Sequence, residues 1–267
     1  MTTVVDWLSR QHAALLFLII LAVTTVVALT CAWGAERLFD DDSRGRTSGT
    51  VTAAVGVVAA VYAVLVAFVI VNEWAAFSAA QAKASDESAA LASVYASASV
   101  LPSPGTGEIQ RAVLAYDRTL VCTEIPRLAT HDGPSAASVA ALHVLYATVA
   151  AHPSDSAFYG NVVSGLNDVV SARRGRINAA VAALPDLLLI VIAVTSIGLL
   201  AVVAALDTKH KRWHYAITGG MAVIIALNLT LVISLDRPFA GAAKVGDSPY
   251  REGIPAATLD CSTRSGA

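Results

Sequence analysis

Four long apolar stretches dominate the hydrophobic pattern of the chain. They cover residues 13–33, 47–72, 187–206 and 215–235, and none of them contains a charged residue. Each is long enough to cross the hydrocarbon core of a bilayer, which takes about 20 helical residues. Backbone groups inside lipid are satisfied only in helices or closed barrels, and these stretches show no period-two alternation. The pattern therefore predicts an all-α, multi-pass membrane protein with four transmembrane helices.

The polar segments divide the chain into four parts. We expect transmembrane hairpins over residues 1–75 and 185–236, a helical extramembrane domain over 76–184, and an extended C-terminal tail over 237–267. Composition supports a membrane location. Hydrophobic residues make up 56% of the chain, charged residues only 14%, and the mean hydropathy is +0.64. So few charges could not cover the surface of a soluble fold of this size, and the expected partner is the lipid bilayer of the plasma membrane.

Four spans return the chain to the side on which it began. The N-terminus, the middle domain and the C-terminus are therefore expected on one side, with loops 34–46 and 207–214 on the other. Lys and Arg near span ends favour the cytoplasm. The two loops contain six such residues and the opposite side contains eight. Charge therefore leaves the orientation open.

The middle domain is predicted to be helical because it is rich in Ala and lacks strand patterns. Pro and Gly breaks separate three expected helices, Glu108–Leu128, Ser135–Ala151 and Asp155–Leu184. Pro126 should bend or end the first of these. Residues 50–99 contain no Pro and a single Gly, so the second span should continue into this domain as one helix of about 75 Å.

Small residues recur along the second span at alternating steps of three and four. They are Ala53, Gly56, Ala60, Ala63 and Ala67. Close backbone approach at small residues drives helix association in lipid, so this small-residue stripe predicts packing against another helix. The alternative is that the stripe reflects only the abundance of Ala in this chain.

A few polar residues lie in or beside the spans. Asn72 and Glu73 end the second span, where Glu73 either faces solvent and headgroups or forms a ring of carboxylates in an oligomer. Asn228 should face another helix or a water-filled path. Asp236 ends the fourth span, where the helix dipole disfavours an anion. We expect Asp236 to pair with Arg237 or another basic group and fix a turn, with ion binding as the alternative.

No pattern indicates catalysis, a cofactor or a metal site. His210 and His214 have ligand spacing, but the cations of Lys209, Lys211 and Arg212 surround them. A net charge of −2 gives no reason to expect a nucleic-acid partner.

The three cysteines differ in their expected roles. Cys31 lies within the first span and should be an inert thiol, whereas Cys122 and Cys261 share one side of the membrane. An extracytoplasmic location would allow a disulfide between these two cysteines, and a cytoplasmic one would leave them free.

Several short motifs occur at Glu87, Leu91, Pro102, Pro185, Leu235, Asp236, Arg237, Pro238, Phe239 and Gly241. With these motifs, the chain resembles the bestrophin-like family of bacterial membrane proteins over about residues 50–250. The resemblance implies two pairs of spans around a helical middle domain. Bestrophins themselves are pentameric ion channels, mostly for anions. In one departure, the second span has no run of bulky aromatic residues resembling the bestrophin pore neck.

These observations favour an oligomeric ion channel with the second helix nearest the axis. The alternative is a non-conducting scaffold or accessory subunit of a larger membrane complex, in which the small-residue stripe contacts a different protein. An enzyme or ion-coupled carrier is not expected, because no carboxylate, Arg or His lies inside a span.

Overall fold

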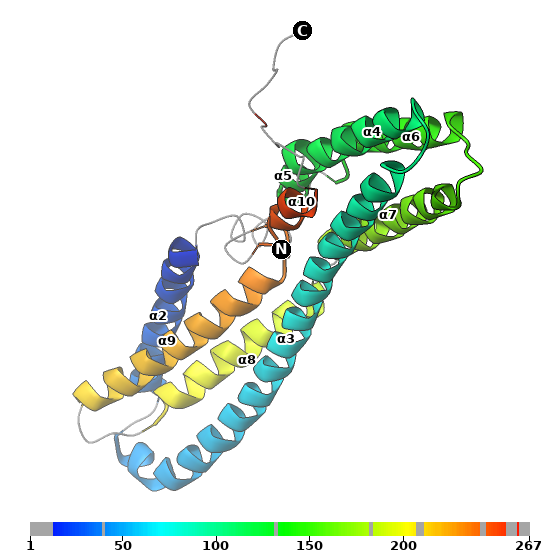
Figure 1. Cartoon of the computed structure of the whole chain (residues 1–267). Coiled ribbons are helices and arrows are strands. Elements are labelled where there is room, and N and C mark those ends of the chain that lie inside the picture. Colours follow the sequence, from blue (N-terminus) through cyan, green and yellow to red (C-terminus); the bar gives the residue numbers. More distant parts are fainter. Residues whose placement is uncertain are drawn as a thin grey trace. The chain divides into compact units, whose positions relative to one another are not determined.

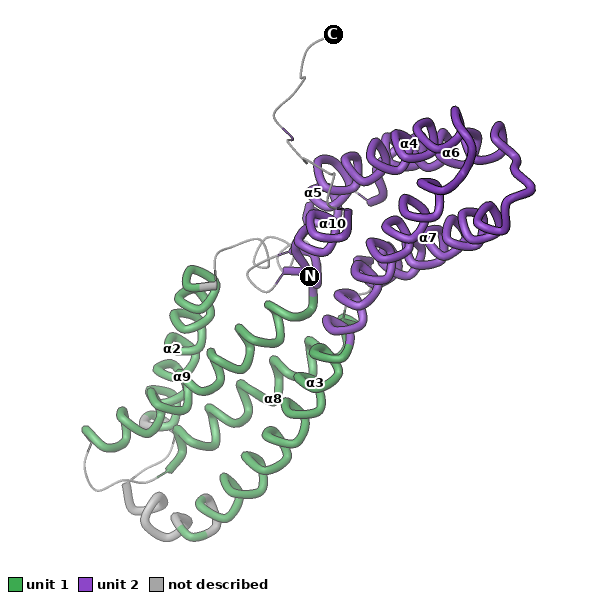
Figure 2. The backbone as a smooth tube through the Cα atoms, viewed as in Figure 1, with its two compact units in different colours: residues 1–75, 183–236 green, residues 76–182, 237–267 purple. Residues whose placement is uncertain are grey.

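The computed structural model describes residues 13–38, 41–130, 133–181, 184–206, 211–240 and 244–254, together with Cys261. The regular secondary structure of these residues is helical throughout. The chain forms two compact units (Figure 2). Unit 1 comprises residues 1–75 and 183–236, and unit 2 comprises residues 76–182 and 237–267.

Along the chain, two helices are followed by the helices of the middle domain and then by two more long helices, in the order predicted from the sequence (Figure 1). They are α2 (Ala13–Leu38), α3 (Asp41–Ala98), α4 (Gly105–Thr119), the π-helical turn η1 (Leu120–Glu124), α5 (Ile125–Ala129), α6 (Ala136–Ala151), α7 (Ala157–Val181), α8 (Asp186–Ala204), α9 (Lys211–Leu235) and α10 (Ser248–Gly253). Four segments are long and apolar enough to cross a membrane, namely Ala14–Ala35 of α2, Thr52–Ala98 of α3, Ala157–Ala204 over α7 and α8, and Arg212–Leu235 of α9. The prediction of four spans is therefore confirmed.

Unit 1 packs its four helices around a shared apolar core and leaves an apolar outer surface. The largest cluster takes buried residues from every helix, namely Ala28, Tyr62, Val66, Leu199, Leu200, Val203, Ala222 and Ile225. Large apolar side chains lie on the outside, where Val64 and Leu187 are each 72% exposed. An apolar exterior around an apolar core is the arrangement that lipid requires.

The two loops that join the spans are shorter than predicted. Residues 34–38 and 41–46 of the predicted loop 34–46 are helical, since α2 continues to Leu38 and α3 begins at Asp41. In loop 207–214, α9 begins at Lys211. No Pro lies in either segment, so helical hydrogen bonding continues past the last apolar residues. Residues 39–40 and 207–210, which include Lys209 and His210, lie outside the described residues.

Helix α3 confirms the continuous helix expected from the absence of Pro over residues 50–99. It runs without a break from Asp41 to Ala98 and contributes to both units. The side of α3 that is buried in unit 2 includes Ala84, Leu91 and Ala98.

Unit 2 is a helical domain built on α4, α6, α7 and the second half of α3. Its core contains Leu91, Val113, Leu145 and Leu166, one from each of these helices. The predicted helix Glu108–Leu128 forms as α4, η1 and α5 in succession. Pro126 does not end it, but the π-helical turn η1 directly precedes the first turn of α5 that contains this proline.

In the described part of the C-terminal region, a short helix and buried residues are present where an extended tail was predicted over 237–267. Its Ser248–Gly253 segment forms α10, and Phe239, Val245, Tyr250 and Ile254 are buried in the core of unit 2. The reason is close packing on α3, where Ser88 Oγ donates a 2.6 Å hydrogen bond to the carbonyl oxygen of Pro249. A side chain at Gly253 would collide with Ser88.

Candidate functional site

A buried ion-pair network occupies the interior of unit 2. Its charged members are Glu87 from α3, Glu124 from η1, and Arg173 and Arg176 from α7. The side chains of Glu87, Glu124 and Arg176 are all 0% exposed. Isolated charges are very costly to bury, so these groups depend on one another for stabilisation.

Arg176 joins the two carboxylates. Its Nε donates to Glu87 Oε2 at 2.5 Å, and its Nη2 donates to Glu124 Oε1 at 2.6 Å. Arg173 Nη2 donates to the second oxygen of Glu124 at 2.8 Å. Burial alone would raise the pKa of Glu124, but the charge of Arg176 and hydrogen bonds from both arginines lower it below its ordinary value. Two cations thus neutralise two anions.

Two tyrosine hydroxyls also donate hydrogen bonds to the carboxylate of Glu87. Tyr116 of α4 donates to Oε1 and Tyr250 of α10 donates to Oε2, each at 2.8 Å. Burial and then the charge of Glu87 raise the pKa of Tyr250, so its hydroxyl stays a donor. Glu87 therefore ties α3 to three other helices, and Glu87, Glu124 and Arg176 of this network are fully buried.

Asp117 lies beside this network but is not neutralised by it. It is 1% exposed, and its Oδ2 has no hydrogen-bond partner among the described residues. Burial, followed by the negative charge of Glu87, raises the pKa of Asp117 to about 7. Its protonated form is therefore favoured in the folded state below about pH 7.

The titration of Asp117 should make unit 2 less stable as the pH rises. Because the folded-state pKa exceeds the unfolded-state value, the unfolded state releases its proton first, and stability falls between about pH 4 and pH 7. Between pH 5 and pH 8, this titration should lower the free energy of unfolding of the wild-type protein by about 2 kcal/mol. Asp117→Asn has no carboxyl group at this position and should not show this decrease. Thermal unfolding of both proteins across this range is the measurement, and parallel pH profiles would contradict the assignment.

Asp236 accepts a backbone hydrogen bond in unit 1. Its Oδ1 accepts from the amide of Leu184 at 2.6 Å, and Leu184 lies just before the start of α8. A carboxylate is favourable near a helix N-terminus, which offsets its unfavourable position at the end of α9. Asp236 thus links the end of the fourth span to the beginning of the third. The sequence-based expectation named a basic partner and did not foresee this amide.

The small-residue stripe of α3 is exposed in the single chain. Ala53, Gly56, Ala60, Ala63 and Ala67 are all exposed, so packing of this face against another helix remains a prediction.

The other polar residues of the spans occupy different environments. Asn72 is exposed and donates to the carbonyl of Phe68 at 2.9 Å, whereas Asn228 is half-buried. Glu73 is only 8% exposed and lies within electrostatic reach of Asp236. The expectation of a solvated Glu73 is therefore wrong, because Glu73 lies on the side of α3 that is buried in unit 1 with Val69, whereas its neighbours Val71 and Trp74 are exposed.

The remaining motif residues have mainly structural positions. Leu91, Leu235, Pro238 and Phe239 are buried, Arg237 is half-buried, and Pro102 and Pro185 are exposed. Pro185 is the N-cap residue of α8. Gly241 lies outside the described residues.

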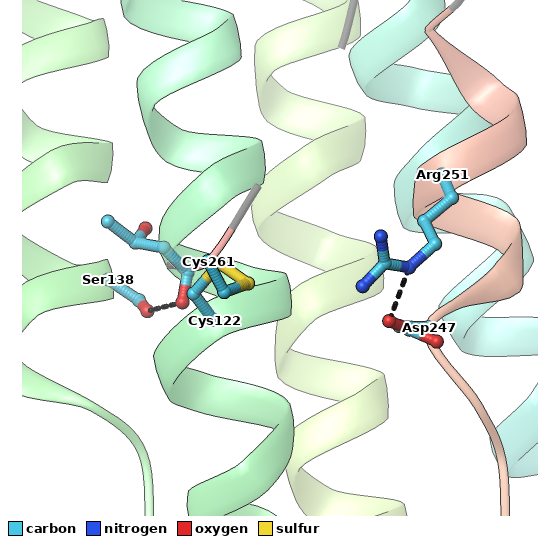
Figure 3. The surroundings of a disulfide bond; sticks show 6 residues. Cys122, Ser138, Asp247, Arg251 and Cys261 are labelled. Atoms are coloured by element: carbon cyan, nitrogen blue, oxygen red, sulfur yellow. Dashed lines mark hydrogen bonds and ion pairs between the residues drawn. A yellow bond between two sulfur atoms is a disulfide. The ribbon is translucent and has the colours of Figure 1, made fainter. Parts of the chain in front are cut away.

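A disulfide joins Cys122 of η1 to Cys261 (Figure 3). The two Cα atoms are 5.5 Å apart, within the usual range for a disulfide. Figure 3 shows Ser138 of α6 close by, whose Oγ donates to the carbonyl of Thr119 at 3.4 Å. The bond closes the chain across 139 residues and attaches the C-terminal region to the middle of unit 2.

Comparison with known proteins gives one family match. No curated protein and no solved structure matches the chain. A family model of the bestrophin-like domain matches residues 22–250, which covers the first span from residue 22 onward, the other three spans, and unit 2 as far as Tyr250 of the Glu87 network. The chain therefore belongs to the bestrophin-like family of membrane proteins.

Proposed function

We propose that the chain assembles into a homo-oligomeric ion channel, with the membrane part of α3 nearest the symmetry axis. The observation that carries this proposal is the small-residue stripe, which is uncharged and exposed in the single chain. A side chain built at Gly56 meets no atom within 4 Å among the described residues. A second helix could therefore approach this face closely, as helix association in lipid requires.

A separate face of α3 is already occupied by the chain itself. Tyr62, Val66 and Val69 are 5%, 4% and 1% exposed, and they pack against α8 and α9. The hydroxyl of Ser196 on α8 donates to Tyr62 Oη at 3.2 Å. Helix α3 is thus held in unit 1 from one side, while its small-residue stripe stays available for other copies of the chain.

Electrical recording tests the channel. The purified protein, with Cys31→Ser as background, should carry current in planar bilayers, and thiol-reactive sulfonates should change the current of Ala60→Cys and Ala63→Cys. Val61→Cys is the matched control, because Val61 lies at the same depth on another face and is 62% exposed. No current across a wide range of ions and pH would refute the channel, and an effect at Val61→Cys alone would refute the axis.

The second candidate function is a non-conducting scaffold or accessory subunit. It is favoured by the lack of any charge along the small-residue stripe, since a different protein could pack there equally well. Purification in mild detergent distinguishes the two functions. Symmetric self-assembly supports the channel, and a stoichiometric foreign protein supports the accessory subunit.

The disulfide also favours one orientation. Disulfides persist in oxidising compartments, so we infer that unit 2 and both termini are extracytoplasmic. The basic residues Lys209, Lys211 and Arg212, between the third and fourth spans and at the start of α9, would then be cytoplasmic, as expected for a positively charged connection. The accessibility of Cys122 and Cys261 from outside the cell tests this orientation.

A further inference from the structure

A cavity of about 440 Å³ opens between α6 and α7 of unit 2. All of its lining residues belong to unit 2, and the proposal does not depend on the channel. Cavities of about 300–1,000 Å³ are the size that holds organic ligands in proteins. Its apolar wall consists of Val139, Leu142 and Val170. Leu142 is buried, whereas Val139 and Val170 are partly exposed, so the apolar surface is open to a ligand.

The polar wall of the cavity is cationic. Arg173 and Arg174 line it together with His143 and Tyr146, and none of the seven lining residues is acidic. The hydroxyl of Tyr146 already donates to Asn167 Oδ1 at 3.4 Å. The two guanidinium groups are therefore the main source of charge at this wall.

The two arginines differ in their capacity to bind an anion. Arg173 is 9% exposed and lines the cavity, but its Nη2 already pairs with Glu124 and its Nε is buried. Arg174 is exposed and forms no ion pair in the part of the chain that the structure describes. Because the charges of Arg173 and Arg176 are balanced by Glu124 and Glu87, Arg174 gives the cavity an excess positive charge.

We propose that this cavity binds an organic acid, with its anionic group at Arg173 and Arg174 and its apolar body against Leu142, Val139 and Val170. Guanidinium groups bind carboxylates through charge-assisted hydrogen bonds, which explains the preference for an acid. The apolar wall selects a ligand with a hydrophobic body over a small inorganic anion. The ligand joins α6 to α7, the helix that also carries the buried ion pairs.

Binding of 2-naphthoate to the full-length protein in nanodiscs tests this proposal. Titration calorimetry should show that 2-naphthoate binds at least about fivefold more tightly than neutral 2-naphthamide and more tightly than inorganic phosphate. Arg174→Gln should weaken binding of the acid by about the same factor. Arg111→Gln is the matched control, because Arg111 is an exposed arginine of α4 outside the cavity.

A second pair of variants isolates the effect of charge inside the cavity. Val170→Glu should abolish binding of 2-naphthoate, whereas Val170→Gln, of the same size, should retain it. Unchanged melting temperatures would show that both variants fold. Equal affinity for the acid and the amide, or full affinity in Arg174→Gln or Val170→Glu, would overturn the proposal.

Discussion

Replacing Arg176 with Met should destabilise unit 2 by about 3–5 kcal/mol, the range for breaking a buried ion pair from one side. The variant leaves Glu87 without its guanidinium partner and Glu124 with Arg173 alone. Both carboxylates are 0% exposed, so water cannot replace the lost donors. Thermal or denaturant unfolding of unit 2 in detergent measures this decrease in the free energy of unfolding.

Arg174→Met is the matched control, because Arg174 is exposed on the same helix two residues away. It should change the free energy of unfolding by no more than about 0.5 kcal/mol. Adding Glu87→Gln to Arg176→Met should recover part of the loss, since the unpaired charge at residue 87 is removed. A loss below about 1 kcal/mol in Arg176→Met would show that the network does not stabilise the fold.

The membrane part of this fold follows closely from sequence because its causes are local. Charge-free stretches of about 20 residues have few alternatives to a transmembrane helix. The length of α3 follows equally well, since a segment of Ala-rich sequence without Pro has no reason to break before Ala98. The loop boundaries were less predictable, because polar residues such as those at 41–46 can continue a helix or leave it.

The buried network could not be predicted from local pattern. Glu87 and Arg176 are 89 residues apart, and Glu124 and Arg176 are 52 apart, so only tertiary packing brings them together. In a helix outside the membrane, a single Glu or Arg usually faces solvent. Arg173 and Arg176 are three residues apart, which places both on one face of α7. This spacing was the only sequence feature that pointed to a shared partner. Glu87 was identified only through its place in a family motif.

The C-terminal region illustrates the same limit. Its Pro and Gly residues favour an extended segment, and the six residues of α10 are too few for a stable isolated helix. Burial of Tyr250 and its hydrogen bond to Glu87 supply the stability that local sequence lacks.

The disulfide should be the second large contribution to the stability of unit 2. Cys122→Ser removes a bond that closes a loop of 139 residues, and loss of such a bond costs about 2–5 kcal/mol. The effect arises mainly because the unfolded chain regains conformational freedom. Melting temperatures of Cys122→Ser and of the wild-type protein under reducing and oxidising conditions measure it. Cys31→Ser is the control, because Cys31 is a free thiol in unit 1.

Reductant should lower the melting temperature of the wild-type protein to that of Cys122→Ser and leave Cys122→Ser itself unchanged. If unit 2 is extracytoplasmic, an impermeant maleimide should label Cys122 and Cys261 in intact cells only after treatment with an impermeant reductant. Labelling without reductant would contradict the disulfide. Labelling that requires lysis would place both cysteines in the cytoplasm, because neither reagent crosses the membrane, and the orientation proposed from the oxidised pair would then be reversed.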